Sequence, residues 1–337
     1  MSRPFLLGVA LFAATAAFAQ QAPVAPPDPS MEPPHYSESV SVGFVLIPFT
    51  AIGPKGTPLT DVRERDVQLY VDGVRVRNDM FERSMNAPVS FTILLDGSGS
   101  MGLAGKMEAA RSAVATLVTH RKPGDDFALY VFAESAAVEV VPFTQDPSKI
   151  VRALDAVKPF GKTAFFDALA TMPQRSDLGA NPTRAIILLS DGIDNASHLT
   201  RAQLPSQLEG VAVPIYPLGL REAAEQQRVD PKNLNEELSD LALLDEIANL
   251  TGGRLFVGNR PEQLSAAVDA LENNLRAQYL IGFPPTGAGA VKYRRISLKL
   301  AGRVRSVRVR AGYLGTEPPL LTASTSGKGK KNERKRS

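Results

Sequence analysis

The sequence contains no cysteine among its 337 residues and only three histidines, His35, His120 and His198. The lack of thiols excludes disulfides, thiolate zinc sites, iron–sulfur clusters and cysteine nucleophiles. No two of the histidines lie at metal-ligand spacing, which excludes zinc sites built on histidine pairs. Any resident metal is therefore expected to be a hard cation held by oxygen atoms.

A strong net charge is also missing from most of the chain. The formal charge is +3, from 38 basic and 35 acidic residues, and the last ten residues hold six basic residues against one acidic residue. This tail accounts for +5, which leaves −2 for the rest, so we expect no specific nucleic-acid-binding surface. We predict a disordered basic tail over residues 315–337; contact of this tail with anionic surfaces is the alternative to a solvated end.

The only long apolar run stands at the N-terminus, from Phe5 to Ala16, and small residues at Ala17 and Ala19 follow it. This pattern predicts a secretory signal peptide over residues 1–19. The competing interpretation is an uncleaved anchor, but the run is shorter than the roughly 20 apolar residues that span a bilayer. We therefore expect an exported protein, periplasmic or secreted, without a transmembrane segment after signal cleavage. Prolines over residues 20–37 predict an extended linker.

The segment 38–86 is predicted to be a small β module. Apolar residues alternate from Val40 to Leu46, and the segments 67–71 and 74–77 flank an Asp72-Gly73 dipeptide that favours a β-hairpin turn. After the central part of the chain, strand-like segments return over residues 277–314. One economical arrangement joins both β segments in a single small sandwich, with the central domain inserted between them.

The central segment, residues 87–276, alternates apolar runs with segments of helical periodicity, which is typical of parallel strands joined by crossover helices. The runs are apolar throughout, as expected for strands buried on both faces. The strands are predicted at 91–95, 127–132, 185–189 and 213–217. Helices are predicted around 107–118, 150–157, 165–172 and 264–275.

In the C-terminal segment, three strands are predicted at 279–283, 296–300 and 304–309, with a phase slip near Ser306 that suits a bulge or bend. Arginines recur along the last of these strands. Because positive charge discourages sheet aggregation, they are predicted to mark the exposed face of an edge strand. They are Arg303, Arg305, Arg308 and Arg310.

Chemistry-bearing residues gather where the predicted parallel strands end. Asp96, Ser98 and Ser100 follow the first strand, Thr163 precedes a helix, and Asp191 ends the strand from Ala185. Ligand sites of such sheets lie beyond the carboxyl ends of the strands. Two carboxylates and three hydroxyls suit Mg²⁺, Mn²⁺ or Ca²⁺. Two carboxylates at most neutralise a divalent ion, so a carboxylate from a partner protein, or a phosphate, could complete its coordination.

Simpler interpretations exist for parts of this pattern. Asp96 or Ser98 alone could be a helix cap, and Asp194 and Asn195 are predicted to cap a loop. Gly161-Lys162-Thr163 imitates the end of a phosphate-binding loop, but Ala156 stands where that motif needs glycine, so nucleotide binding is rejected. An exposed loop position is the interpretation we favour for His198.

At these residues the sequence resembles the von Willebrand factor type A domain, whose motif is Asp-x-Ser-x-Ser with a distant threonine and a distant aspartate. The resemblance covers about residues 88–275. It implies a Rossmann-like domain, with a mostly parallel sheet flanked by helices, and a metal-ion-dependent adhesion site. It further implies that the hydroxyls bind metal directly and that the carboxylates bind through water, or directly in an alternative state. The matching positions are Asp96, Ser98, Ser100, Thr163 and Asp191.

The flanking β segments resemble those of secreted bacterial proteins of acidobacterial type that contain such domains. The resulting hypothesis is an exported, non-enzymatic protein whose bound cation, Mg²⁺ before Mn²⁺ or Ca²⁺, recognises an acidic residue on a protein partner in adhesion or envelope assembly. Two alternatives stay open. One is a structural scaffold in which metal is dispensable. The other is a metal-assisted hydrolase, which the sequence disfavours because no placed general base or nucleophile motif is visible.

Overall fold

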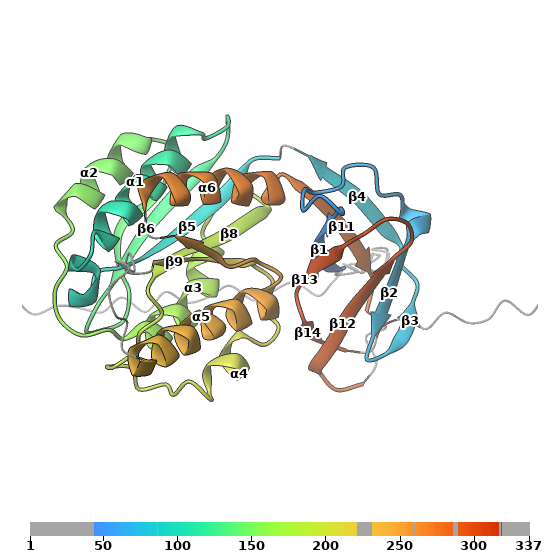
Figure 1. The fold of residues 1–337 in the computed structure, drawn as a ribbon. Coiled ribbons are helices and arrows are strands. Elements are labelled where there is room, and N and C mark those ends of the chain that lie inside the picture. The colour runs from blue at the N-terminus through green and yellow to red at the C-terminus, as the bar shows by residue number, and fades with distance from the viewer. Residues whose placement is uncertain are drawn as a thin grey trace, which may run out of the picture. The chain divides into compact units, whose positions relative to one another are not determined.

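The computed structural model describes residues 44–85, 87–220, 231–258, 260–285, 289–316 and 318 (Figure 1). These residues belong to one compact unit. The predicted signal peptide, the proline-rich linker and nearly all of the basic tail lie outside the described residues, so those predictions are not tested. Within the described part of the chain, no helix combines the length and apolarity that crossing a bilayer requires.

A six-stranded sheet, ordered β10-β9-β8-β5-β6-β7, forms the centre of the α/β part. All neighbouring pairs are parallel except β6 and β7, which are antiparallel. The expected mostly parallel sheet is confirmed, with one antiparallel edge that the sequence pattern did not indicate. In chain order the strands are β5 (Val89–Asp96), β6 (Asp126–Phe132), β7 (Val138–Thr144), β8 (Thr183–Ser190), β9 (Ile215–Leu220) and β10 (Phe256–Gly258).

Helices cover both faces of this sheet (Figure 1). One face packs against α1 (Lys106–Thr119), α2 (Pro147–Ala156) and α6 (Pro261–Leu275). The other face packs against α3 (Phe165–Ser176), α4 (Leu204–Leu208) and α5 (Pro231–Thr251). Alternate residues of β5 enter the two cores, as the pleat of a strand requires: Ile93 packs in the first and Leu94 in the second. The sheet is therefore buried on both faces.

Two four-stranded antiparallel sheets form the β part, ordered β13-β1-β11-β4 and β14-β12-β2-β3. Strands from before and after the α/β part interleave, because β11 lies between β1 and β4, and the two sheets share one core. The strands are β1 (Val45–Ile52), β2 (Val67–Val71), β3 (Val74–Val76), β4 (Met80–Met85), β11 (Ala277–Phe283), β12 (Lys292–Leu300), β13 (Ser306–Val309) and β14 (Gly312–Gly315).

The predicted hairpin is present. Val71 of β2 pairs with Val74 of β3, and the two turn residues, Asp72 and Gly73, have φ angles of 50° and 81°. Positive φ at both central positions defines the turn type that suits two-residue hairpins, and glycine adopts it without steric penalty.

The alternation predicted at the start of the β module has the opposite phase in the structure. Phe44 and Leu46 are about two-fifths exposed, at 42% and 41%, whereas Ile47 and Phe49 are buried in the shared core. The segment is apolar in both phases between Phe44 and Ile47, so its sequence alone does not decide which face is buried. Packing against the second sheet decides it.

The prediction that all four C-terminal arginines are exposed is wrong for Arg310, which is buried, and Arg308 is half-buried rather than exposed. β13 is an edge strand, as expected, and Arg303 and Arg305 are exposed. Arg310, however, is only 6% exposed, and its Nη2 donates to the carbonyl oxygen of Leu46 at 2.9 Å. Burial lowers the pKa of Arg310 to about 10. Residue 310 lies just beyond β13, where the chain turns inward.

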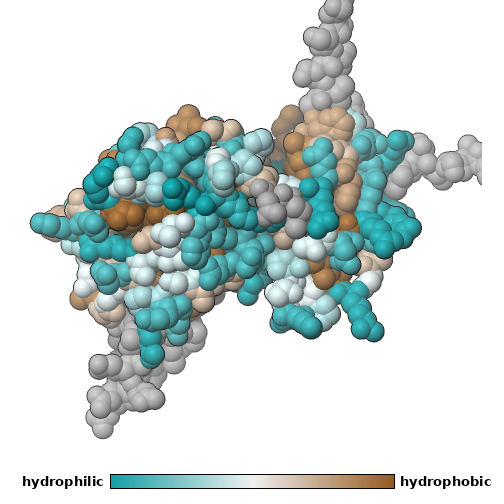
Figure 2. Space-filling view, turned by 90° about the horizontal axis from the view of Figure 1, so that it is seen from above, coloured by the Kyte–Doolittle hydropathy of each residue, from teal (hydrophilic) through white to brown (hydrophobic). Residues whose placement is uncertain are grey.

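Most of the surface visible from above is hydrophilic, and hydrophobic residues appear there in separate patches among polar ones (Figure 2). This distribution is ordinary for a folded domain, because single exposed apolar residues are common. An inference about a binding surface must therefore rest on where particular apolar side chains gather.

Candidate metal centre

The Asp96 carboxylate ends β5 and is completely buried. Its Oδ1 accepts a hydrogen bond from the backbone N–H of Ser98 at 2.9 Å, and its Oδ2 accepts one from the Ser190 hydroxyl at 2.7 Å. Burial raises the pKa of Asp96 to about 6, and the negative charge of Asp191 acts in the same direction, while hydrogen bonds from Ser98 and Ser190 oppose both. Asp96 and Asp191 are therefore close enough to repel each other.

The two predicted serine ligands lie at the start of the loop that follows β5. Ser98 is buried, Ser100 is half-buried, and their hydroxyl oxygens are 3.1 Å apart. Ser98 precedes the short 3-10 helix η2 (Gly99–Gly102), and Ser100 lies within it. Both hydroxyls are thereby held beside the end of β5.

Thr163 lies on a second loop, just before α3, and is 1% exposed. Two backbone hydrogen bonds attach this loop to the first one: Gly99 N–H donates to the Gly161 carbonyl at 3.0 Å, and Phe160 N–H donates to the Gly97 carbonyl at 2.9 Å. The Thr163 loop is therefore fixed against the serines, as the strand order predicts.

Asp191 directly follows β8 and is 9% exposed. Its Oδ1 accepts from the N–H of Ile193 at 3.3 Å, and its Oδ2 accepts from the Lys106 ammonium at 2.9 Å. Both side chains of this ion pair are only 5% exposed. Lys106 is the first residue of α1, and the sequence analysis did not identify it, because a lysine at a helix start is usually solvated.

The structure thus brings the five predicted donors to the carboxyl edge of the sheet, on three loops. The donors are carboxylate and hydroxyl oxygens only. Two of them belong to buried carboxylates of the same charge, and a cation would reduce the repulsion between these carboxylates. This donor set fits a hard divalent cation. That the five residues bind metal stays a prediction.

The residues predicted to cap a loop do so. The Asp194 Oδ2 accepts from the N–H of Phe166 at 3.0 Å, in the first turn of α3, and the Asn195 Oδ1 accepts from the N–H of Thr163 at 2.8 Å. His198 is a loop residue with a side chain that is 98% exposed, and its Nδ1 lies 2.9 Å from the Asp167 carboxylate. These three residues shape the loop that faces Thr163.

A second group of potential ligands was missed by the sequence analysis, because its members are far apart in the chain. His120 Nδ1 lies 3.1 Å from the Asp269 carboxylate and 3.7 Å from that of Glu272. Glu272 also pairs with Arg276 at 3.4 Å. The arrangement is explained as a network of ion pairs between α1 and α6.

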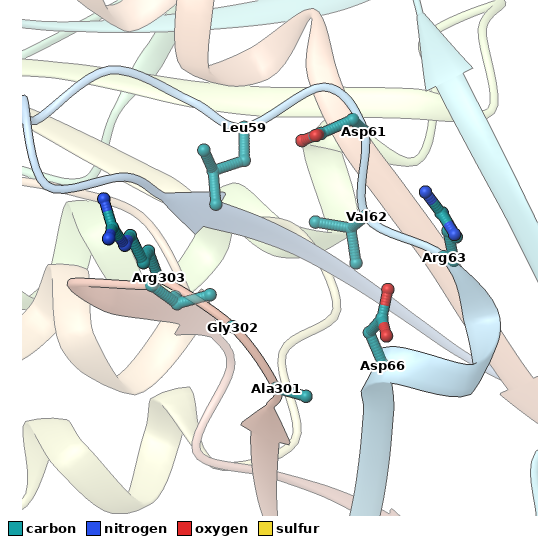
Figure 3. A pocket seen from close by; sticks show the side chains of 9 residues that line it. Leu59, Asp61, Val62, Arg63, Asp66, Ala301, Gly302 and Arg303 are labelled. Atoms are coloured by element: carbon teal, nitrogen blue, oxygen red, sulfur yellow. The ribbon is translucent and has the colours of Figure 1, made fainter.

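A pocket of about 390 Å³ lies in the β part rather than at the candidate metal centre (Figure 3). Figure 3 shows Leu59 and Val62 pointing toward its middle and Arg303 on the wall opposite Asp61. The nine described residues that line it carry both charge signs and include no histidine, serine or threonine. The pocket therefore offers no pair of a hydroxyl nucleophile and a histidine base, and its electrostatic potential does not favour a ligand of one charge sign.

Comparison with curated proteins gives distant relatives. An uncharacterized protein of Borreliella burgdorferi is 26% identical over 195 residues, which cover 52% of this chain and 55% of that protein. A UPF0353 protein of Nocardia farcinica is 25% identical over 191 residues, which cover 50% and 57%. The chain spans little more than half the length of these relatives.

Among solved structures, a von Willebrand factor type A protein of Catenulispora acidiphila is 17% identical, with 80% of this chain and 73% of that chain covered and a TM-score of 0.46. At this sequence identity and TM-score, the similarity supports no conclusion about function. The model of the von Willebrand factor type A domain family, however, matches residues 91–193. That segment runs from β5 to the loop after β8 and contains all five predicted ligands. The chain therefore carries a von Willebrand factor type A domain.

Proposed function

We propose that this protein binds a protein partner through a divalent cation held by its von Willebrand factor type A domain, and that it is not an enzyme. Domains of this family often mediate protein–protein interaction. The observation that carries the proposal is the pair of buried, mutually repelling carboxylates, Asp96 and Asp191, beside three hydroxyl donors. A carboxylate pair of this kind is a natural counter-charge for a divalent cation.

The hydroxyls of Ser98, Ser100 and Thr163 would hold the cation directly, and Asp96 and Asp191 would hold it through water or directly. Mg²⁺ is the first choice for such oxygen donors, with Mn²⁺ and Ca²⁺ as alternatives. The bound cation would supply positive charge at the surface.

A charge count indicates what the loaded centre would attract. The two carboxylates balance a divalent cation, and the buried ammonium of Lys106 adds one positive charge. The loaded centre would therefore carry about +1, which favours an anionic group from outside. A carboxylate on a protein partner fits this charge and completes an oxygen shell.

The enzymatic alternative requires a base or nucleophile at the centre. Both described histidines are bonded to carboxylates, His198 to Asp167 and His120 to Asp269, and neither pairing contains a hydroxyl nucleophile. This supports a binding role. The predicted signal peptide supports a location outside the cytoplasm, in the periplasm or after secretion. A binding protein at that location would take part in adhesion or envelope assembly.

Calorimetric titration of Mg²⁺, Mn²⁺ and Ca²⁺ into the chelator-treated mature protein tests the centre. Wild type is expected to bind and Asp96→Ala is not, whereas Asp61→Ala, an exposed carboxylate in the β part, serves as the matched control and is expected to bind like wild type. Equal heats for wild type and Asp96→Ala would contradict the proposal. Turnover of a phosphate ester that requires both metal and Asp191 would favour the hydrolase instead.

A further inference from the structure

Three large apolar side chains are exposed beside the candidate metal centre. Leu103, Phe160 and Ile193 are 58%, 72% and 37% exposed. Each lies two or three positions from a predicted ligand: Leu103 follows Ser100, Phe160 precedes Thr163, and Ile193 follows Asp191. We call these three residues the apolar rim.

Backbone contacts place the members of the apolar rim at the same edge of the sheet. The N–H of Phe160 bonds to the Gly97 carbonyl at 2.9 Å, and a Cβ on Gly102, the neighbour of Leu103, would lie 3.4 Å from Pro159 Cβ. The N–H of Ile193 bonds to the Asp191 carboxylate at 3.3 Å. The rim therefore comes from the same three loops as the predicted ligands.

The loop that carries Phe160 is also positively charged. Lys158 and Lys162 are exposed on either side of Phe160, and one exposed acidic residue, Glu134, accepts a hydrogen bond from the backbone N–H of Lys162 at 3.3 Å. The charges of this loop thus favour an acidic segment over a basic one. Asp194, next to Ile193, is half-buried and accepts a hydrogen bond from the N–H of Phe166 at 3.0 Å. The partner surface is therefore expected to be both acidic and apolar.

We propose that the apolar rim selects the partner: it takes a protein segment in which an aspartate or glutamate stands next to a large aliphatic or aromatic side chain. This inference rests on the proposed function. The carboxylate would reach the metal centre and the apolar side chain would cover Leu103, Phe160 and Ile193. Carboxylates occur on every protein surface, so charge alone discriminates poorly, whereas burial of a leucine-sized side chain changes affinity by roughly ten- to hundredfold.

A random peptide library displayed on phage tests this surface. Phage are captured on the mature protein in Mg²⁺ and released with chelator, so that metal-dependent binders alone are sequenced. Peptides from wild type are expected to carry an acidic residue within two positions of a large apolar residue. The affinity of the best peptide is then measured for each variant. Phe160→Ser is expected to bind this peptide tenfold or more weakly, while its Mg²⁺ binding stays as in wild type.

Leu178→Ser is the matched control. Leu178 is 69% exposed, but its loop lies at the opposite edge of the sheet, where the N–H of Ala180 bonds to the Asp126 carboxylate at the start of β6 at 3.1 Å. This variant is expected to bind the peptide like wild type.

The outcomes separate the two proposals. Metal-dependent acidic peptides without an apolar neighbour, or unchanged affinity of Phe160→Ser, would overturn the role of the rim and leave the metal centre standing. Two outcomes would overturn both proposals. One is that chelator releases no acidic peptides from wild type, and the other is that Asp96→Ala captures the same peptides as wild type.

Discussion

Replacing Lys106 by methionine is expected to tighten Mg²⁺ binding. The Lys106 ammonium lies 2.9 Å from the Asp191 Oδ2, and both side chains are 5% exposed. Removal of one partner from a buried ion pair typically costs about 3–5 kcal/mol, because the other charge is left without a counter-ion. In the variant only the metal-free protein bears this cost, since a bound cation would neutralise Asp191.

Binding and folding are linked, so a large part of that cost reappears as metal affinity. Recovery of about 1.4 kcal/mol already corresponds to a tenfold change, and we therefore expect Lys106→Met to bind Mg²⁺ at least tenfold more tightly than wild type. Its metal-free form is expected to unfold at lower urea concentration, and Mg²⁺ is expected to restore much of the lost stability.

Calorimetry measures the affinity, and urea unfolding with and without Mg²⁺ measures the stability. Lys106→Arg retains the positive charge and is expected to bind Mg²⁺ about as wild type does. Lys162→Met removes an exposed charge from the same edge of the sheet and is expected to have little effect. Equal or weaker Mg²⁺ binding by a folded Lys106→Met would refute the reasoning, because a purely structural lysine can only weaken the site when lost.

Three further variants test individual packing contacts of the α/β part, each by urea unfolding. Gly253→Ala would place a Cβ 1.8 Å from the carbonyl oxygen of the first residue of β9, so a loss of more than about 3 kcal/mol is expected, and wild-type stability would contradict this contact. Arg276→Met leaves the buried Asp125 carboxylate without its ion-pair partner at 2.5 Å and is expected to lose about 3–5 kcal/mol. Ser190→Ala removes a hydroxyl that bonds to Asp96 at 2.7 Å and should lose about 1–3 kcal/mol.

The sequence indicates most of the central domain because its strands are continuous apolar runs. The runs at 91–95 and 185–189 became β5 and β8, and the helical stripe from Met107 to Val118 became the buried face of α1. β7 gave no such signal. It is an antiparallel edge strand whose Val138 is 61% exposed, so its apolar residues do not mark a buried face.

The long helix α5 was also missed, since its apolar and polar residues are not cleanly segregated to two faces. Its buried residues Leu243, Leu244 and Ile247 cover one face of the sheet. The ends of this helix are marked in the sequence, by Asp230-Pro231 at its start and by Gly252-Gly253 after its last residue, so the weak apolar stripe alone accounts for the omission.

The candidate centre likewise has a part that the sequence could predict and a part that it could not. That the five predicted donors lie together could be inferred from sequence, because each follows or precedes a predicted element at the carboxyl edge of the sheet. Lys106 could not, because its contact with Asp191 spans 85 positions in the chain and depends on burial of a helix terminus. Local patterns report which face of a helix is apolar, and they do not report which charged side chain turns inward to meet a partner.

The connections between the two parts of the chain lie away from the candidate centre. The chain enters the central sheet between β4 and β5 and leaves it between α6 and β11. Arg276 joins both crossings: it lies between α6 and β11, and its Nη1 donates to the Ala87 carbonyl at 3.3 Å. Asp125, its ion-pair partner, precedes β6.

These contacts lie at the amino ends of the strands, whereas Asp96 ends β5, seven residues and about 23 Å of strand from Val89. A partner bound at the centre would therefore not need to contact the crossings. Arg276→Met should accordingly lower stability while the protein that remains folded binds Mg²⁺ like wild type, because the lost ion pair lies at the opposite end of β5 from Asp96.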